Sequence, residues 1–411
     1  MPSLLNPTLR LNLGRRSGAD IVGLDIQPGH VAAVQARVNG AVVVKHGAGA
    51  PLPADTVREG EVLDEGVLSE ALRALFADGR LSRRVRLGVA NQRTVLRTLE
   101  LPPITDRKEL AAAVRSQAQD QVPMPLNNAV LDFHPLGVVD TPDGPRQRVV
   151  LVAAQRDMIQ RLLAAVQGAG LRPEGVDLSA FALIRSLYRP DPEHTDRVLY
   201  LNVDGLTNMA IAEGTTCRFT RVVGGGIEAM ASELAERRSI PLVEARELII
   251  SVDLSARPEP EPEPEATVVE PEPEPVGVAG DEQPTVAVDV EDAQADPTTD
   301  PPYSPAAPSE VASPQPEADV RAVLDNGIRE IAGEVRNSLD FHRSQEGGGE
   351  VSRVVLSGSA LDLSGFADSL QEQLGVQVER ESVRLDEQDP GGVSVHRLAI
   401  AAGLAVEEVP Q

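Results

Sequence analysis

Acidic residues stand close to glycines at two places where the chain is expected to reverse direction between strands. Asp25 precedes Gly29 and His30, and Asp204 is followed directly by Gly205. Backbone amides of such turns can bind phosphate oxygens, while a carboxylate beside them can hold the water ligands of Mg²⁺. The same pattern is also typical of Asx turns, in which aspartate only supports the turn. These residues therefore predict either a phosphate site or two structural turns.

Glycine-rich turns occur at two further positions. Residues 224–226 are all glycine and directly precede an expected helix, and Gly358 lies between Ser357 and Ser359. Such a turn lets a nucleoside approach the backbone closely, but it can also be a plain connection between a strand and a helix. The sequence shows no metal-binding cluster and no Gly-x-Ser-x-Gly elbow. This pattern argues against nucleophilic catalysis of the hydrolase type.

Composition favours helices packed on sheets in more than one folded unit. The chain has 411 residues, whereas a single hydrophobic core stops growing at about 250 to 300 residues. Hydrophobic residues make up 41% of the chain, yet aromatic residues make up only 2% and Trp is absent. Val, Leu and Ala must therefore fill the cores.

The charge balance and the single cysteine exclude several classes of partner and site. With 63 acidic and 38 basic residues the net charge is −25, which disfavours nucleic acid and anionic lipid as partners. Cys217 alone can form neither an intrachain disulfide nor a multi-cysteine metal site. No apolar run reaches the length of about eighteen residues that spans a bilayer, and residues 1–20 lack the apolar core of a signal peptide. We therefore expect a cytoplasmic protein without a direct membrane span.

Residues 258–319 differ from the rest of the chain. They begin PEPEPEPEATVVEPEPEP, contain 17 acidic residues and no Lys or Arg, and show no hydrophobic periodicity. Such a segment cannot bury a core, so we expect a disordered, extended spacer. The remainder of the chain then carries a charge of only −8.

Hydrophobic periodicity and turn residues divide the rest of the chain into units. After an extension at 1–20, residues 21–92 predict strands at 21–24, 31–36, 41–45 and 85–90 and a helix at 64–76. Residues 93–178 predict a small α+β inset with strands at 95–101, 130–136 and 148–154 and helices at 108–119 and 157–169. Residues 179–257 predict strands at 198–203, 208–213 and 219–223 and helices at 227–237 and 240–250. Residues 320–411 complete this second lobe and return to the first, with a helix at 323–341 and a strand at 353–356.

Several stretches, read together, carry a family resemblance. The most diagnostic are LRTLELPPITDRKELAAAVRSQAQDQVPMPLNNAVLDF from Leu96 and VVLVAAQRDMIQRLLAAVQGAGLRPEGVDLSAFAL from Val149. IVGLDIQPGHVAAVQA from Ile21, FTRVVGGGIEAMASELAE from Phe219 and VVLSGSALDLSGF from Val354 follow in family order. The chain resembles the type IV pilus assembly protein PilM family, related to the division protein FtsA. The resemblance implies an α/β, actin-like (ribonuclease H-like) fold with two lobes, a small α+β inset and a disordered acidic Pro/Glu-rich insertion.

The resemblance also implies a nucleotide site. It places a first phosphate loop at 25–32, a second at 202–208 and an adenosine turn at 356–360. Gln27, Pro28 and Ala32 stand where the family usually has Gly, Ser and Lys, and the second loop is one residue shorter. The candidate residues for ATP with Mg²⁺ are Asp25, Gln27, Gly29, His30, Asp204, Gly205, Thr207, Asn208, Gly224, Gly225, Gly358 and Ser359.

The function implied is that of a scaffold rather than a metabolic enzyme, with at most slow ATP hydrolysis and no catalytic or metal-binding residues assigned. Such a scaffold belongs to the inner-membrane platform of a type IV pilus or a related type II secretion system. Its implied partners are the cytoplasmic N-terminal tail of a PilN-like bitopic membrane protein and other platform proteins. The tail would bind the inset near residues 108–119 and 130–136, although those faces could simply pack together. An FtsA-like division protein and an enzyme of the sugar-kinase class are the alternatives.

Overall fold

The computed structural model describes residues 21–190, 196–255, 316–345, 347–386 and 392–407. Its first sheet has the strand order β10-β6-β1-β2-β3-β16. The strands β1 (Val22–Gln27), β2 (His30–Val38) and β3 (Val42–Pro51) form an antiparallel meander. The strands β6 (Arg84–Val89) and β10 (Arg172–Leu178) extend it in parallel on one side, and β16 (Arg384–Leu385) adds to β3 on the other.

The second sheet repeats this plan. Its order is β13-β12-β11-β14-β15. The strands β11 (Arg197–Val203), β12 (Thr207–Glu213) and β13 (Thr216–Val223) form the meander, and β14 (Val351–Ser357) and β15 (Val378–Arg380) run parallel to β11. Two lobes of similar design therefore each present a hairpin turn, one after β1 and one after β11.

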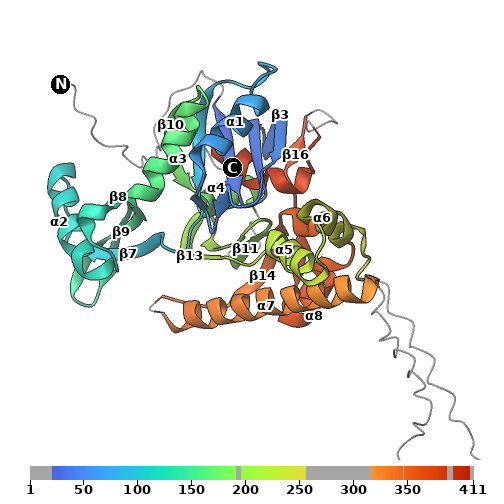
Figure 1. Ribbon diagram of the computed structural model, residues 1–411. Helices are drawn as coiled ribbons and strands as arrows, with labels where there is room; N and C mark the ends of the chain where they lie inside the picture. Colours follow the sequence, from blue (N-terminus) through green and yellow to red (C-terminus); the bar gives the residue numbers. More distant parts are fainter. Residues whose placement is uncertain (1–20, 191–195, 256–315, 346, 387–391, 408–411) are drawn as a thin grey trace, which may run out of the picture. The chain divides into compact units, whose positions relative to one another are not determined.

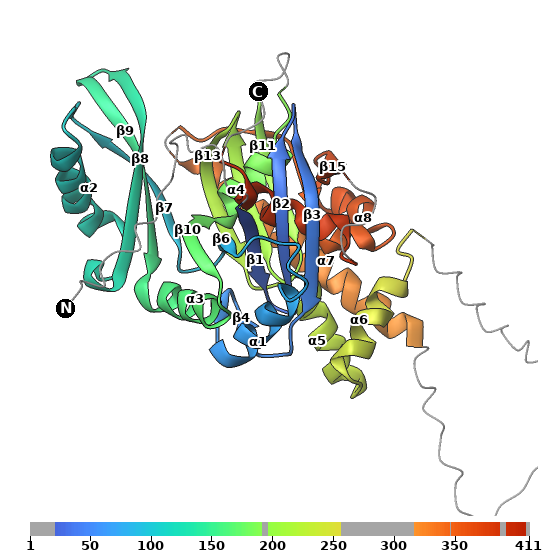
Figure 2. The same cartoon turned by 90° about the horizontal axis from the view of Figure 1, so that it is seen from above.

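Helices cover the outer face of each sheet. On the first sheet, α1 (Glu65–Leu75) and α3 (Arg156–Gly168) share a hydrophobic core with β1 and β6, beside the short ribbon β4 (Val57–Arg58) and β5 (Glu61–Val62). Figure 2 shows α3 beside α1. On the second sheet, α5 (Ile227–Arg238), α6 (Leu242–Ser251), α7 (Pro316–Ser344) and α8 (Phe366–Leu374) form another core, with α7 and α8 side by side (Figure 1).

Two helices lie between the sheets. The helices α4 (Ser179–Leu187) and α9 (Ala399–Ala405) share a core with residues of both meanders. Gly403 lets the two helices touch, because a methyl group there would lie 1.8 Å from the carbonyl oxygen of Ala182. A methyl group at Gly23 of β1 would lie 1.8 Å from the carbonyl oxygen of Ala401. The helix α9 is thus clamped between β1 and α4.

The inset has its own small core. Its sheet has the order β7-β9-β8, formed by β7 (Val95–Leu101), β9 (Gly144–Gln155) and β8 (Ala129–Thr141). One face is covered by α2 (Arg107–Gln121), which Asp106 caps by accepting hydrogen bonds from two backbone amides. The 3-10 helices η1 (Leu126–Asn128), η2 (Ser359–Asp362) and η3 (Val395–Leu398) complete the elements described.

The inset differs in extent from the predicted range 93–178. Strand β10 pairs with β6, and α3 packs against α1, so both belong to the first lobe. The residues predicted as spacer, 258–319, lie outside the described residues as far as 315, whereas 316–319 are the first residues of α7. Among the described residues, no helix is long and apolar enough to cross a membrane.

We expect that replacing residues 258–315 with a flexible linker of about ten residues leaves the folded lobes intact. The end of α6 and the start of α7 are already close, because Arg321 donates a hydrogen bond of 2.7 Å to the carbonyl oxygen of Asp253. Urea unfolding should change by less than about 1 kcal/mol, since loop length costs little entropy. A loss of several kcal/mol would show that the lobes depend on the deleted segment.

Candidate functional site

The two hairpin turns meet between the lobes. A methyl group at Gly205 would lie only 2.3 Å from the carbonyl oxygen of Pro28, so the turns are in direct contact. Gln27 connects them: its amide donates a hydrogen bond of 2.7 Å to Asp25, and its carbonyl oxygen accepts one of 3.2 Å from the backbone of Leu206. A side chain of the protein therefore occupies the junction between the two predicted phosphate loops.

Asp204 is the most heavily engaged carboxylate of the junction. It is 2% exposed and accepts a hydrogen bond of 2.6 Å from the Ser359 hydroxyl. The His30 Nε2 atom lies 3.4 Å from the other carboxylate oxygen, Oδ2, whereas Arg397 Nε lies 3.7 Å from Oδ1, the oxygen that accepts the Ser359 hydrogen bond. Burial lowers the pKa of His30, while the nearby Asp204 opposes that shift. Asp204 thus joins the first hairpin, the 358–359 turn and η3.

Asp25 lies deeper and is also 2% exposed. Burial raises the pKa of Asp25 to about 7, the hydrogen bond from Gln27 lowers it, and the charge of Asp204 raises it further. Ala32 is its direct cross-strand partner and is fully buried. Facing side chains in an antiparallel pair lie close enough to interact. A cation at position 32 would therefore stand beside Asp25, and in this chain that position is apolar.

A cavity of about 360 Å³ opens at the outer side of the junction. Its charged lining comes from His30, Asp204, Glu228, Arg246, Asp362 and Arg397. Glu228 and Arg246 form a two-point ion pair in which one contact, from Nε, is 2.9 Å. The carboxylate of Glu228 also packs against the turn at Gly29. Both arginines of the cavity are therefore next to carboxylates.

The structure brings most of the predicted residues together here. Asp25, Gln27, Gly29, His30, Asp204, Gly205 and Ser359 form the junction, and Gly358 packs against the end of β11 with φ +96°. Thr207 donates a hydrogen bond of 2.6 Å to the carbonyl oxygen of Gly225 and so supports the 224–226 turn. A methyl group at Gly224 would lie 3.4 Å from Gln92.

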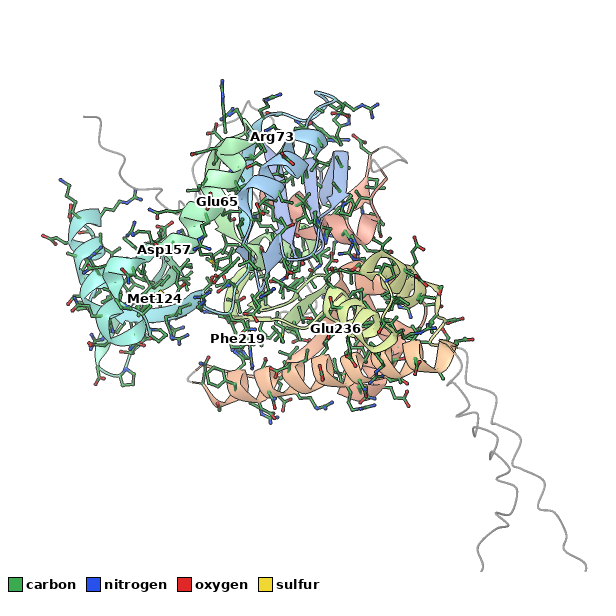
Figure 3. All side chains as sticks on the ribbon, in the orientation of Figure 1. Glu65, Arg73, Met124, Asp157, Phe219 and Glu236 are labelled. Carbon is green, nitrogen blue, oxygen red and sulfur yellow. The ribbon has the colours of Figure 1, made fainter. Side chains whose placement is uncertain are left out.

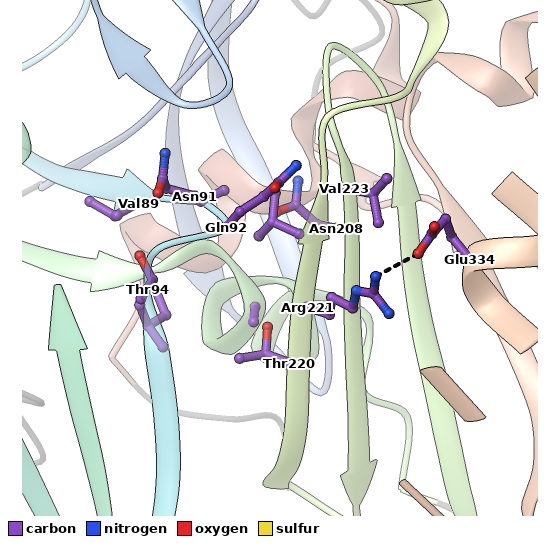
Figure 4. Close-up of a pocket in the computed structure, with 13 residues that line it drawn as sticks. Val89, Asn91, Gln92, Thr94, Asn208, Thr220, Arg221, Val223 and Glu334 are labelled. Atoms are coloured by element: carbon purple, nitrogen blue, oxygen red, sulfur yellow. Dashed lines mark ion pairs between the residues drawn. The ribbon is translucent and has the colours of Figure 1, made fainter. Parts of the chain in front are cut away.

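Asn208 lines a different cavity, also of about 360 Å³. Figure 4 shows Asn208 with Asn91, Gln92 and Thr220, beside the ion pair between Arg221 and Glu334, which measures 2.7 Å. Asn208 therefore points away from the cavity lined by His30 and Asp204.

The sequence prediction lacks four of the charged residues that line this cavity, namely Glu228, Arg246, Asp362 and Arg397. Glu228 lies in the first turn of α5, just after the glycines at 224–226. An acidic residue beside a glycine-rich turn is a pattern from which the sequence could have indicated a polar site. Nothing in the local sequence connects Glu228 with Arg246 on α6, with Asp362 in η2 or with Arg397 in η3. Only the tertiary fold brings these charges to the hairpins.

ATP with Mg²⁺ does not fit between the turns as they stand. Phosphates bound from both sides need space, yet the backbones at Gly205 and Pro28 touch. Asp25, which would hold the waters of Mg²⁺, is buried with a raised pKa of about 7. Across the described part of the chain, no group of three His, Cys, Asp or Glu residues is placed to hold a metal ion.

Comparison with known proteins places these features in context. The family model of the type IV pilus assembly protein PilM matches residues 23–247. The solved structure of a PilM-PilN type IV pilus biogenesis complex is similar, with 20% identity, a TM-score of 0.66, and coverage of 94% of this chain and 98% of that chain. The ethanolamine utilization protein EutJ from Carboxydothermus hydrogenoformans matches with 14% identity, a TM-score of 0.46, and coverage of 97% and 93%. MreB5 of Spiroplasma citri bound to AMPPNP matches with 9% identity, a TM-score of 0.46, and coverage of 93% and 94%. The predicted actin-like α/β fold with two lobes is confirmed.

Proposed function

The chain belongs to the type IV pilus assembly protein PilM family, and from this we propose that it is a scaffold that captures the tail of a PilN-like membrane protein. In this role it sits in the cytoplasm at the inner-membrane platform of a pilus or a related secretion system. Its place beneath the membrane then comes from its partner. The resemblance to a PilM-PilN complex supports this choice of partner.

The observation that carries the proposal is the outer edge of the inset. Strand β8 is the last strand of its sheet, and no other described strand pairs with its free edge. Partly buried apolar side chains lie along it and below α2, among them Met124, Leu126, Leu131 and Phe133. A sheet edge beside apolar pockets can hold an extended peptide through backbone hydrogen bonds and side-chain contacts.

The packing also limits how this surface can be tested. Leu131 and Phe133 are partly buried against the core between β8 and α2. Part of each side chain therefore packs within the inset, and only the remainder is available to a peptide. A charge at either position acts on both folding and binding, and only a folded variant is informative about binding.

We expect Phe133→Glu to weaken capture of the tail by about tenfold or more, because it removes an apolar contact and buries a charge at the rim. The measurement is calorimetric titration of the full chain with a synthetic peptide of the tail. Val138→Glu is the matched control, because Val138 lies on the same strand, is 56% exposed and is outside the apolar cluster. Phe133→Leu keeps the packing and should bind nearly as well as the parent.

The decisive comparison is between folded proteins. Circular dichroism and thermal unfolding establish which variants keep their structure. Absence of tail binding by the parent chain contradicts the scaffold proposal. Equal binding by folded Phe133→Glu and Val138→Glu contradicts only the β8 site.

The junction between the lobes supports a scaffold over a kinase. Its arginines are paired with carboxylates and its turns are in contact, so the groups that would neutralise a transferred phosphate are engaged elsewhere. Regulation by ATP would require the turns to separate and Asp204 to exchange its present partners. Capture of the tail requires neither change, and an FtsA-like role lacks a supporting feature among the described residues.

A further inference from the structure

A groove separate from the two cavities described above lies away from the hairpin junction. It encloses about 590 Å³ between β7 of the inset, the neighbouring ends of β11 and β13, and the C-terminal end of α7. Three separate parts of the chain therefore build it, and none of its lining belongs to the outer edge of β8.

The charged lining of this groove is mainly basic. Arg97, Arg148, Arg197 and Arg218 face only two carboxylates, those of Glu100 and Glu213. Arg148 donates a hydrogen bond of 3.0 Å to Glu100, while Arg218 and Arg197 share Glu213 at 3.2 and 3.7 Å. Arg97 has no carboxylate partner among the described residues and is exposed. On a protein of net charge −25, this is a local excess of positive charge.

Buried polar atoms in the groove lack partners. His342 is only 3% exposed, yet neither ring nitrogen has a hydrogen-bond partner in the described structure. The Nε atom of Arg197 is buried and unpartnered as well. A buried polar atom left unsatisfied costs roughly 1 to 3 kcal/mol. Native structures normally satisfy such atoms, so these two side chains point to a ligand.

An apolar contact surface accompanies the charges. The rings of Phe219 and Phe341 are tilted with centroids 6.0 Å apart, and Phe341 is 53% exposed. Figure 3 labels Phe219 beside α7. The centroid of the Phe219 ring also lies 6.0 Å from that of the His342 ring. An exposed aromatic side chain beside arginines is typical of protein-binding surfaces.

Strand β7 supplies backbone groups to the same groove. It pairs with β9 on one side and is the last strand of its sheet on the other, and residues 96–98 line the groove. An extended peptide can therefore lie along this edge and exchange backbone hydrogen bonds with it. The arginines are distributed over two sheets, which suits carboxylates spaced along a peptide better than one compact anion.

We propose that this groove binds an extended acidic segment of a partner protein. Its carboxylates pair with Arg97, Arg197 and Arg218, one of them reaches His342, and an apolar residue rests on Phe341. This partner contact is separate from capture of the membrane-protein tail at β8.

The test uses the full chain and a fluorescein-labelled octapeptide of alternating glutamate and valine that ends in phenylalanine. Arg97→Glu should weaken its binding by about tenfold. The substitution reverses a charge that attracts the acidic peptide and pairs with one of its carboxylates. Arg97→Lys should retain most of the affinity. Arg115→Glu, on the exposed face of α2, is the matched control and should bind like the parent.

His342→Phe separates binding from structure. The ring contact with Phe219 can be kept while both nitrogens are removed, so we expect an unchanged or raised Tm together with weaker peptide binding. In the parent, addition of the peptide should move the NMR signals of the His342 ring and leave those of His46 in place.

The remaining outcomes would overturn the proposal. One is equal binding of the glutamine version of the peptide. Another is equal displacement by inorganic phosphate, which would indicate a site for small anions. A third is that the peptide binds only after residues 258–315 are deleted, which would indicate that the chain's own acidic residues occupy the groove. Unchanged affinity in a folded His342→Phe variant would likewise reject the groove.

Discussion

Replacing Asp25 with asparagine is expected to stabilise the protein at pH 8 by on the order of 4 kcal/mol. The pKa of Asp25 is raised from 3.8 to about 7, mainly because the carboxyl is buried. Folded Asp25 therefore keeps its proton where the unfolded chain has lost it, and stability falls as pH rises from about 4 to 7. Asparagine keeps the shape and can still accept the hydrogen bond from Gln27 without carrying a charge.

The pH dependence gives this prediction its sharpest test. Urea unfolding at pH 8 and pH 5.5 should show the advantage of Asp25→Asn shrinking by about 2 kcal/mol at the lower pH. Asp143→Asn, at an exposed position of the β8–β9 turn, is the matched control and should show no such change. A variant less stable than the parent at pH 8 would mean that the Asp25 carboxylate has net favourable partners.

Replacing Gly403 with alanine is expected to destabilise the protein by about 3 kcal/mol or more. The added methyl group would lie 1.8 Å from a backbone oxygen of α4, which no change of rotamer can relieve. Relaxation must separate α9 from α4 and open the core that the lobes share. The measurement is thermal or urea unfolding of the full chain.

Gly333 provides the matched control for Gly403→Ala. It also lies within a helix, α7, but a methyl group there would meet no atom within 4 Å. Gly333→Ala should therefore stabilise the protein by about 0.5 to 1 kcal/mol through helix propensity. Similar destabilisation by both substitutions would contradict the explanation from close packing.

Periodicity predicted the elements that have one apolar face. The expected strand at 95–101 coincides with β7, and the expected helix at 64–76 differs from α1 by one residue at each end. Strand β10 and helices α4 and α9 went unassigned. Helix α9 is apolar throughout and so shows no polar face, and α4 and α9 have only nine and seven residues, too few for periodicity to identify a helix. The range predicted for the inset, 93–178, includes the residues of α3 and β10. The pairing of β10 with β6 and the packing of α3 on α1 are tertiary contacts that no local pattern encodes.

Of the candidate site, the sequence could predict only the turns. Acidic residues and glycines indicated both hairpins, and the family resemblance indicated that they face each other. That the turns touch through Gln27, Pro28 and Gly205 depends on how the lobes close, which no local pattern encodes. The ion pair of Glu228 with Arg246 is likewise a product of the packing of α5 on α6.

The position of α9 also has a consequence for biosynthesis. Its residues, 399–405, leave the ribosome long after β1, yet they fill the space against Gly23 and cover the inner side of the first meander. Contacts so distant along the chain are slow to form. A nascent chain halted before residue 399 should therefore expose apolar side chains of β2 and β3 and attract chaperones. The lobe translated first is thus expected to mature last.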